Sequence, residues 1–182
     1  MSHAVVLVEE DSAQILVREI SYRLDMKDRT TIIRHEGKND LDRSIPNKLG
    51  RWRSAESVRF LIVRDNDNGN CHSLKVRLKS LVPTNAVANT RIRIVVQELE
   101  AWYFGDPGAL AAAGFDIAAA ACGRAKFRSP DSIPSPKSEI KRLISYEGQI
   151  ALARRMAPHL DLTNSKSPSF LHFVSALKWA GH

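Results

Sequence analysis

The sequence of 182 residues has few cysteines and no glycine-rich phosphate-binding motif. Cys71 and Cys122 are too few for a disulfide framework, and they lack the paired spacing of a zinc site. This composition fits a reducing compartment, so we expect a cytoplasmic protein. No Walker or dinucleotide-binding glycine motif is present, and no Ser/His/Asp or Cys/His grouping stands out. Nothing therefore indicates serine or cysteine nucleophiles.

Long hydrophobic runs are also missing. The alanine-rich stretch of residues 109–121 is interrupted by Gly114 and Asp116, so we predict no membrane-spanning helix. The apolar run of residues 4–8 follows no basic segment and is too short for a signal peptide. We expect no membrane partner.

What the chain does have is an ordinary globular composition with an excess of positive charge. Its length is that of one domain, with 43% hydrophobic and 26% charged residues. Lys and Arg number 27 against 20 Asp and Glu, which leaves a formal charge of +7. This excess favours nucleic acid or another polyanion as a partner, although a merely soluble surface explains the charge equally well.

Short apolar runs alternate with helical patterns through the first half of the chain. The predicted strands are residues 4–8, 30–35, 59–64 and 91–97. The predicted helices between them cover residues 12–24, 41–52, with a break or late first turn at Pro46, and 73–82. The last segment also fits a strand, and we interpret it as a helix because Leu74, Leu78 and Leu81 share one helix face. This alternation predicts a parallel sheet with right-handed crossovers.

The second half of the chain has a helical pattern. Short pieces at residues 99–104 and 109–113 precede a basic loop at residues 124–135, and the predicted helices are residues 137–146, 149–159 and 169–179. We therefore predict an α/β fold: a Rossmann-like sheet of about four mainly parallel strands flanked by helices, with a helical C-terminal part. The domain prediction is a single domain over residues 1–182, with a core of residues 1–105 and a helical extension of residues 106–182 packed on it.

Each predicted strand ends in a carboxylate. The acids are Glu9 and Glu10, Glu36, Asp65 and Asp67, and Glu98 with Glu100. Because the carboxyl ends of parallel strands face one crevice, these side chains are expected to gather there. Clustered carboxylates repel one another unless a cation or a proton neutralises them. The pattern therefore predicts a metal site.

The sharpest local feature is Asp65-Asn66-Asp67. Two acids one residue apart in an extended chain point to the same side and can share one divalent cation. An EF-hand loop is excluded, because its sixth and twelfth positions would be Asn70 and Val76. A hydrated turn remains the alternative, since Asp, Asn and Gly dominate turns. With Glu9 after the first strand, we favour the metal interpretation.

Basic side chains mark candidate nucleic-acid contacts. Arg124, Lys126 and Arg128 lie in the predicted basic loop around Phe127, and Lys38 follows the second strand. Aromatic residues among basic ones can bind a phosphate backbone and stack a base. The alternative is a solvated face whose aromatic residue belongs to the core.

Several stretches together resemble the Toprim pattern of topoisomerases, primases and related nucleases. The acid after the first strand and the Asp-x-Asp after the third carry it. More closely, the chain resembles a Toprim-like domain-of-unknown-function family of bacterial proteins, some of which sit beside ATPases in phage-defence loci. The matching stretches are residues 8–13, 35–41, 64–71, 98–102 and 167–170.

The resemblance implies roles for individual residues. Glu9 becomes the general acid/base or a metal ligand, and Asp65 and Asp67 become Mg²⁺ (or Mn²⁺) ligands, so these three are the predicted catalytic residues. Two positions depart from the Toprim pattern. Glu10 stands where the pattern usually has a glycine, and Ala13 stands where it often has an acid. Glu98 and Glu100 are the acids that could restore the missing ligand.

The leading hypothesis is a Mg²⁺-dependent Toprim-type phosphodiesterase or nuclease in a phage-defence or DNA-repair setting. The alternative is a non-catalytic interaction module, an effector or immunity partner of an ATPase that keeps the Toprim-like fold. A third hypothesis is a protein that binds nucleic acid without catalysing a reaction.

Overall fold

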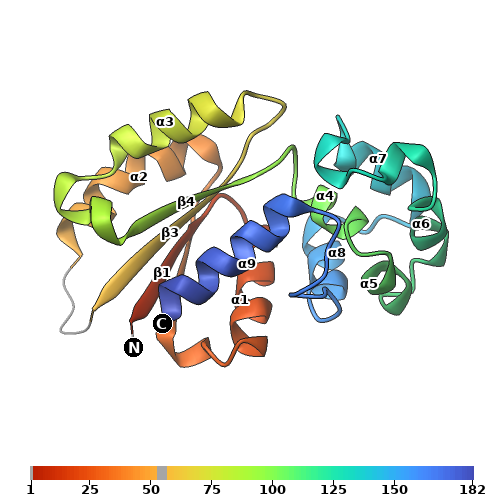
Figure 1. Cartoon of the computed structure of the whole chain (residues 1–182), viewed down its shortest axis with the longest axis horizontal. Coiled ribbons are helices and arrows are strands. Elements are labelled where there is room, and N and C mark those ends of the chain that lie inside the picture. Colours follow the sequence, from red (N-terminus) through yellow and green to blue (C-terminus); the bar gives the residue numbers. More distant parts are fainter. Residues whose placement is uncertain (1, 53–56) are drawn as a thin grey trace.

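The computed structural model describes residues 2–52 and 57–182. Four strands in this part of the chain form one sheet, in the order β2-β1-β3-β4, and all neighbouring pairs are parallel (Figure 1). The strands are β1 (His3–Val8), β2 (Thr30–Arg34), β3 (Val58–Asp65) and β4 (Thr90–Val95). The predicted α/β fold with a parallel Rossmann-like sheet is confirmed.

Helices cover both faces of the sheet. In Figure 1, α2 and α3 lie on one face, and α1 and α9 lie on the other. Their bounds are α1 (Asp11–Arg23), α2 (Lys38–Arg51), α3 (Cys71–Leu81) and α9 (Pro168–Gly181). The ambiguous segment of residues 73–82 is thus helical, as predicted.

The burial of β1 explains why its sequence is continuously apolar. Val5 and Leu7 belong to the core under α2 and α3, whereas Ala4, Val6 and Val8 belong to the core under α1 and α9. Successive side chains of a strand point to opposite faces, so a strand covered on both faces needs apolar residues at every position.

The remaining helices lie beyond the carboxyl end of the sheet (Figure 1). They are α4 (Glu100–Phe104), α5 (Pro107–Ala112), α6 (Asp116–Ala121), α7 (Pro136–Leu143) and α8 (Gln149–Met156), with short 3₁₀ turns at Lys27–Arg29, Thr84–Asn89, Ala125–Phe127 and Pro130–Ser132. After this group the chain returns to the sheet as α9. The division of the domain at residue 105 stays a prediction.

One detail differs from the sequence-based expectations. Pro46 does not break α2, which runs through it, because Leu41, Ile45 and Leu49 are buried against the sheet and hold the helix in place. The alanine-rich stretch is interrupted as predicted, because α5 ends at Ala112 and α6 begins at Asp116, where an acid in the first turn complements the helix dipole. In the described ranges, no helix is long and apolar enough to cross a membrane.

Candidate functional site

The candidate site lies where the strand order reverses. β1 pairs with β2 on one side and with β3 on the other, so the connections after β1 and β3 diverge from their shared carboxyl end. In open α/β sheets such a switch point is where ligands bind. Glu9 directly follows β1, Asp65 is the last residue of β3, and Asp67 lies two residues further. The fold thus brings the three predicted catalytic residues to one place.

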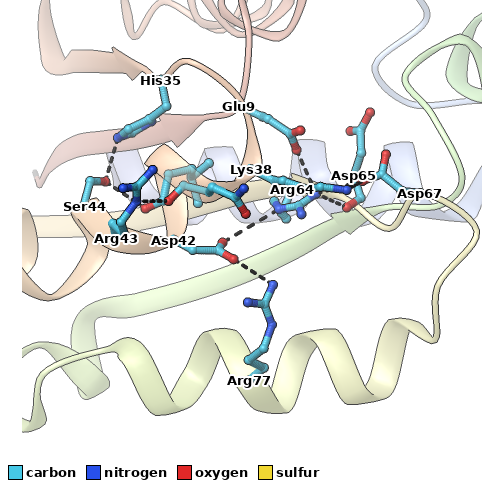
Figure 2. A network of polar contacts seen from close by, with 12 residues as sticks. Glu9, His35, Lys38, Asp42, Arg43, Ser44, Arg64, Asp65, Asp67 and Arg77 are labelled. Atoms are coloured by element: carbon cyan, nitrogen blue, oxygen red, sulfur yellow. Dashed lines mark hydrogen bonds and ion pairs between the residues drawn. The ribbon is translucent and has the colours of Figure 1, made fainter.

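Arg64 links two of these acids. Its Nη1 lies 2.8 Å from Oε2 of Glu9 and 3.6 Å from Oδ2 of Asp67 (Figure 2). Lys38, at the start of α2, places its Nζ 3.2 Å from the same oxygen of Asp67. The Arg64 side chain is only 4% exposed, whereas that of Lys38 is 54% exposed. Glu9 and Asp67 therefore share one buried guanidinium nitrogen, and Asp67 also pairs with a cation at the surface.

On its other side Arg64 faces a second acid that the sequence reasoning missed. Oδ1 of Asp42 lies 3.8 Å from Nε of Arg64, and Oδ2 of Asp42 pairs with Nη2 of Arg77 at 2.7 Å (Figure 2). Two signals pointed to this network. Arg64 is a charged residue directly after the apolar run of residues 60–63, and Asp42 shares the helix face of Ile45 and Leu49.

Asp65 differs from its neighbours because it has no cationic partner among the described residues. Its carboxylate points away from Arg64 in Figure 2, while its backbone oxygen accepts a hydrogen bond from Nη1 of Arg64. Burial, and then the charges of Glu9, Glu10 and Glu100, raise the pKa of Asp65 well above its usual value. Burial also raises the pKa of Glu9, against the opposing effect of Arg64. Negative charge at this point is therefore only partly compensated by the protein.

The turn after β3 is fixed to the end of β4. The backbone N–H of Asn66 donates to the oxygen of Val95 at 3.2 Å, and its Oδ1 accepts from the backbone N–H of Gln97 at 2.5 Å. Asp67 and Gln97 both have positive φ angles, 48° and 66°, a backbone conformation that residues other than glycine rarely adopt. Such strained positions gather at functional sites and persist only where surrounding contacts hold them.

The two acids after β4 have different surroundings. Oε2 of Glu98 accepts a hydrogen bond from the backbone N–H of Lys137 at 3.0 Å, in the first turn of α7. Glu100 is 2% exposed, and its Oε2 is buried with no hydrogen-bond partner in residues 2–52 and 57–182. Burial raises the pKa of Glu100 to about 7. Glu100 thus lies near the acid cluster of Glu9, Asp65 and Asp67. Glu98 instead binds α7, one of the helices beyond the sheet.

The donor set fits a hard divalent cation. Carboxylate oxygens are the ligands Mg²⁺ prefers. Asp65, which has no cationic partner, and the orphaned oxygen of Glu100 are groups that such a cation would neutralise. Across the described ranges, no three Asp, Glu, His or Cys side chains are arranged to hold a metal ion together. The metal roles of Glu9, Asp65, Asp67, Glu98 and Glu100 stay predictions.

Replacing Glu100 by Gln is expected to stabilise the protein in a pH-dependent way. The pKa of Glu100 rises from 4.5 to about 7 on folding. The contribution of this carboxyl group to the unfolding free energy is therefore most favourable below pH 4.5 and is lost as the pH rises to 7. Relative to wild type, Glu100→Gln should therefore gain up to about 3 kcal/mol of unfolding free energy between pH 4.5 and pH 8. Urea unfolding in EDTA at pH 5 and pH 8 measures the difference. The exposed Glu147→Gln is the control, and an equal effect of Glu100→Gln at both pH values would contradict the assignment.

The predicted nucleic-acid residues form two separate groups. Lys38 lies at the acid cluster, whereas Arg124, Lys126 and Arg128 lie around the 3₁₀ turn Ala125–Phe127. Nζ of Lys126 pairs with Oε2 of Glu139 at 2.7 Å, and Arg124 and Arg128 are exposed. Phe127 is buried, and its ring stacks on that of Phe104 with centroids 4.7 Å apart, so this aromatic residue belongs to the core. Nucleic-acid contacts by the four basic residues stay a prediction.

The fold and the site place this chain among α/β proteins that carry acidic side chains at the switch point of a parallel sheet. The family model described as "Domain of unknown function (DUF4276)" matches residues 8–178. The chain therefore belongs to the DUF4276 family. No curated protein sequence matches it.

Solved structures share the fold. The C-terminal region of the Burkholderia pseudomallei OLD protein is 14% identical, with a TM-score of 0.56 and coverage of 100% of both chains. The C-terminal region of the Xanthomonas campestris pv. campestris OLD protein gives 15% identity and a TM-score of 0.53, over 98% of this chain and 97% of that one. A second structure of that region is 16% identical, with a TM-score of 0.52, and the match covers 100% of this chain and 99% of that one. The likeness is one of fold.

Proposed function

We propose that this protein is a Mg²⁺-dependent phosphodiesterase, a Toprim-type nuclease acting in phage defence or DNA repair. The observation that carries the proposal is the convergence of Glu9 and Asp67 on one nitrogen of Arg64, beside the unpaired Asp65. These are the positions that match the Toprim acids. The net charge of +7 suits a nucleic-acid substrate.

In this proposal Asp65 and Asp67 hold Mg²⁺ or Mn²⁺, with Glu9 or Glu100 completing the set. The bound cation supplies charge stabilisation in the transition state and lowers the pKa of an attacking water. Glu9, whose pKa is raised by burial, is suited to exchange a proton with the reacting oxygen. Lys38 presents its exposed ammonium group beside Asp67, where it can bind a phosphate oxygen.

The departure from the Toprim pattern at Glu10 is compatible with this chemistry. Glu10 has an extended backbone, with φ −150° and ψ 172°, which needs no glycine. Its Oε1 accepts hydrogen bonds from Oγ of Ser12 and, at 3.3 Å, from Nε2 of Gln149 on α8. These neutral donors hold the added carboxylate toward the helical part of the molecule.

A second candidate function is a non-catalytic interaction module, such as the partner of an ATPase. The pairing of Arg64 and Lys38 favours it, because Glu9 and Asp67 already have protein counter-ions. In that case the acid cluster stabilises the fold and has no need of a metal.

A calorimetric titration with Mg²⁺ and Mn²⁺ separates the two functions. The enzyme proposal expects saturable uptake by the wild type that is lost in Asp67→Asn, because that carboxylate is a ligand. The matched control is Asp28→Asn, an exposed acid of the turn Lys27–Arg29, which should leave uptake unchanged. The same proteins are then assayed for cleavage of single-stranded DNA, duplex DNA and RNA. No uptake and no cleavage by the wild type would favour the interaction module.

A further inference from the structure

A groove of about 580 Å³ runs along the free edge of β4. β4 is the last strand of the sheet and lies between α3 and α9 (Figure 1). Residues of these three elements line the groove, with β4 as its floor. Its volume falls within the range of about 300 to 1,000 Å³ that ligand sites occupy. The groove is distinct from the acid cluster and from the basic turn Ala125–Phe127.

Basic groups come from every side of this groove. His72 and Lys75 line it from α3, Arg93 from β4 and His172 from α9. Burial and the charge of Arg93 lower the pKa of Lys75, and burial and the charge of Arg91 lower the pKa of Arg93. Holding these cations close together is unfavourable without an anion to compensate them.

Asp131, the acidic residue of the groove, forms no ion pair with Lys75 or Arg93, and its oxygens accept hydrogen bonds from neutral donors instead. Oδ1 of Asp131 accepts hydrogen bonds from the hydroxyls of Ser167 and Ser169, and its Oδ2 accepts from the backbone N–H of Ser169 at 2.8 Å. These contacts fix the beginning of α9 and leave Lys75 and Arg93 without an acidic partner among the described residues.

The groove begins next to the acid cluster. Nδ2 of Asn66, between Asp65 and Asp67, contacts Sγ of Cys71 at 3.1 Å, and Cys71 lines the groove. Oδ1 of Asn66 accepts from Gln97, the neighbour of Val96 in the groove floor. A single side chain thus separates the acids from the start of the groove. A chain-like ligand bound at the acid cluster can extend directly along β4.

An edge strand can also accept an extended peptide, but Arg93 blocks part of this edge. Its Nη1 donates to the backbone oxygen of Ile92 at 3.0 Å, and its Nε donates to the backbone oxygen of His172 at 3.0 Å. A strand partner would need the oxygen of Ile92 for its own ladder. The same contacts orient the guanidinium and leave its other N–H groups for an anion. The groove therefore suits phosphates better than a peptide.

We propose that this groove binds the phosphate backbone of a single nucleic-acid strand, with Lys75 and Arg93 as the main phosphate contacts and His72 and His172 as further donors. The proposal rests on the proposed function in one respect: it makes the groove the path by which the strand leaves the acid cluster. The site itself requires only a polyanion with regularly spaced phosphates.

Fluorescence anisotropy with a labelled single-stranded oligonucleotide in EDTA tests the proposal in the absence of cleavage. The double variant Lys75→Gln/Arg93→Gln should bind at least about tenfold more weakly than wild type at low salt. Its plot of log K against log salt should be shallower by about 1.4, since each neutralised phosphate of a single strand contributes about 0.7. The control is Lys48→Gln/Arg51→Gln, which replaces two exposed basic residues of α2 and makes the same charge change. Because Arg93 also contacts the backbone of α9, Lys75→Glu alone is measured as well, together with the melting temperature of each variant.

The possible outcomes separate this inference from the nuclease proposal. Wild-type affinity of the double variant and of Lys75→Glu would overturn the groove assignment, even if the acid cluster cleaves nucleic acid. Weakened binding by these variants supports the groove even if no cleavage is ever seen. Poly-L-glutamate serves as the competitor without phosphates. If it displaces the oligonucleotide as well as an unlabelled strand does, the groove is a site for acidic polypeptides and the nucleic-acid assignment is overturned.

Discussion

Asp65→Asn is expected to lower metal-dependent phosphodiester cleavage by roughly 10³-fold while leaving the fold intact. Asp65 has no cationic partner in the described part of the chain, and its pKa is raised by burial and by the neighbouring acids. Asparagine keeps the shape of the side chain but removes the charge that a divalent cation needs. Because the change also relieves repulsion from Glu9, Glu10 and Glu100, the variant should be at least as stable as wild type.

The measurement is a time course of cleavage with Mg²⁺ or Mn²⁺, together with a urea unfolding curve of the same preparation. Asp28→Asn is again the control for an exposed acid and should cleave at the wild-type rate. Loss of activity together with loss of stability would mean that Asp65 serves the fold. Cleavage by Asp65→Asn at the wild-type rate would remove Asp65 from the mechanism and, with it, the Toprim-type assignment.

Much of the fold is predictable because local patterns and global packing agree. The continuous apolar run of residues 4–8 indicates a strand covered on both faces, and β1 is indeed buried between two helix layers. The alternation of strands and helices then restricts the topology to a parallel sheet. Pro46 was misleading because intrinsic helix propensity is weaker than the burial of a helix face on a sheet.

The site is predictable only in part. The positions of Glu9, Asp65 and Asp67 follow from one property of any parallel sheet: the carboxyl ends of its strands lie on the same side. Their counter-ions do not follow from that rule. Arg64 is the next-to-last residue of β3, and its partner Asp42 comes from α2, 22 positions earlier in the chain. Pairing over such a distance depends on how α2 sits on the sheet, which no local pattern contains.

The second large effect is expected from Arg64→Met. The side chain is buried and faces Glu9, Asp67 and Asp42, so its loss leaves the largely buried Glu9 and Asp42 without their shared cation. Removing one partner of a buried ion pair destabilises proteins by about 3 to 5 kcal/mol. Urea unfolding in EDTA at neutral pH should show a loss of this size. Arg77→Met is the control, because the Arg77 side chain is 55% exposed and its pairing with Asp42 should contribute only about 1 kcal/mol or less.

Magnesium should recover part of the stability that Arg64→Met loses. A cation bound by Glu9 and Asp67 takes over the charge compensation that Arg64 provides in the wild type, so binding to the folded state raises the unfolding free energy. The midpoint of urea unfolding of Arg64→Met should therefore increase with Mg²⁺ concentration, and by more than that of the wild type, where Arg64 competes for the same carboxylates. If Mg²⁺ leaves the variant's midpoint unchanged, Arg64 is the cation that the cluster is built around, and the interaction module becomes the better account of the acids.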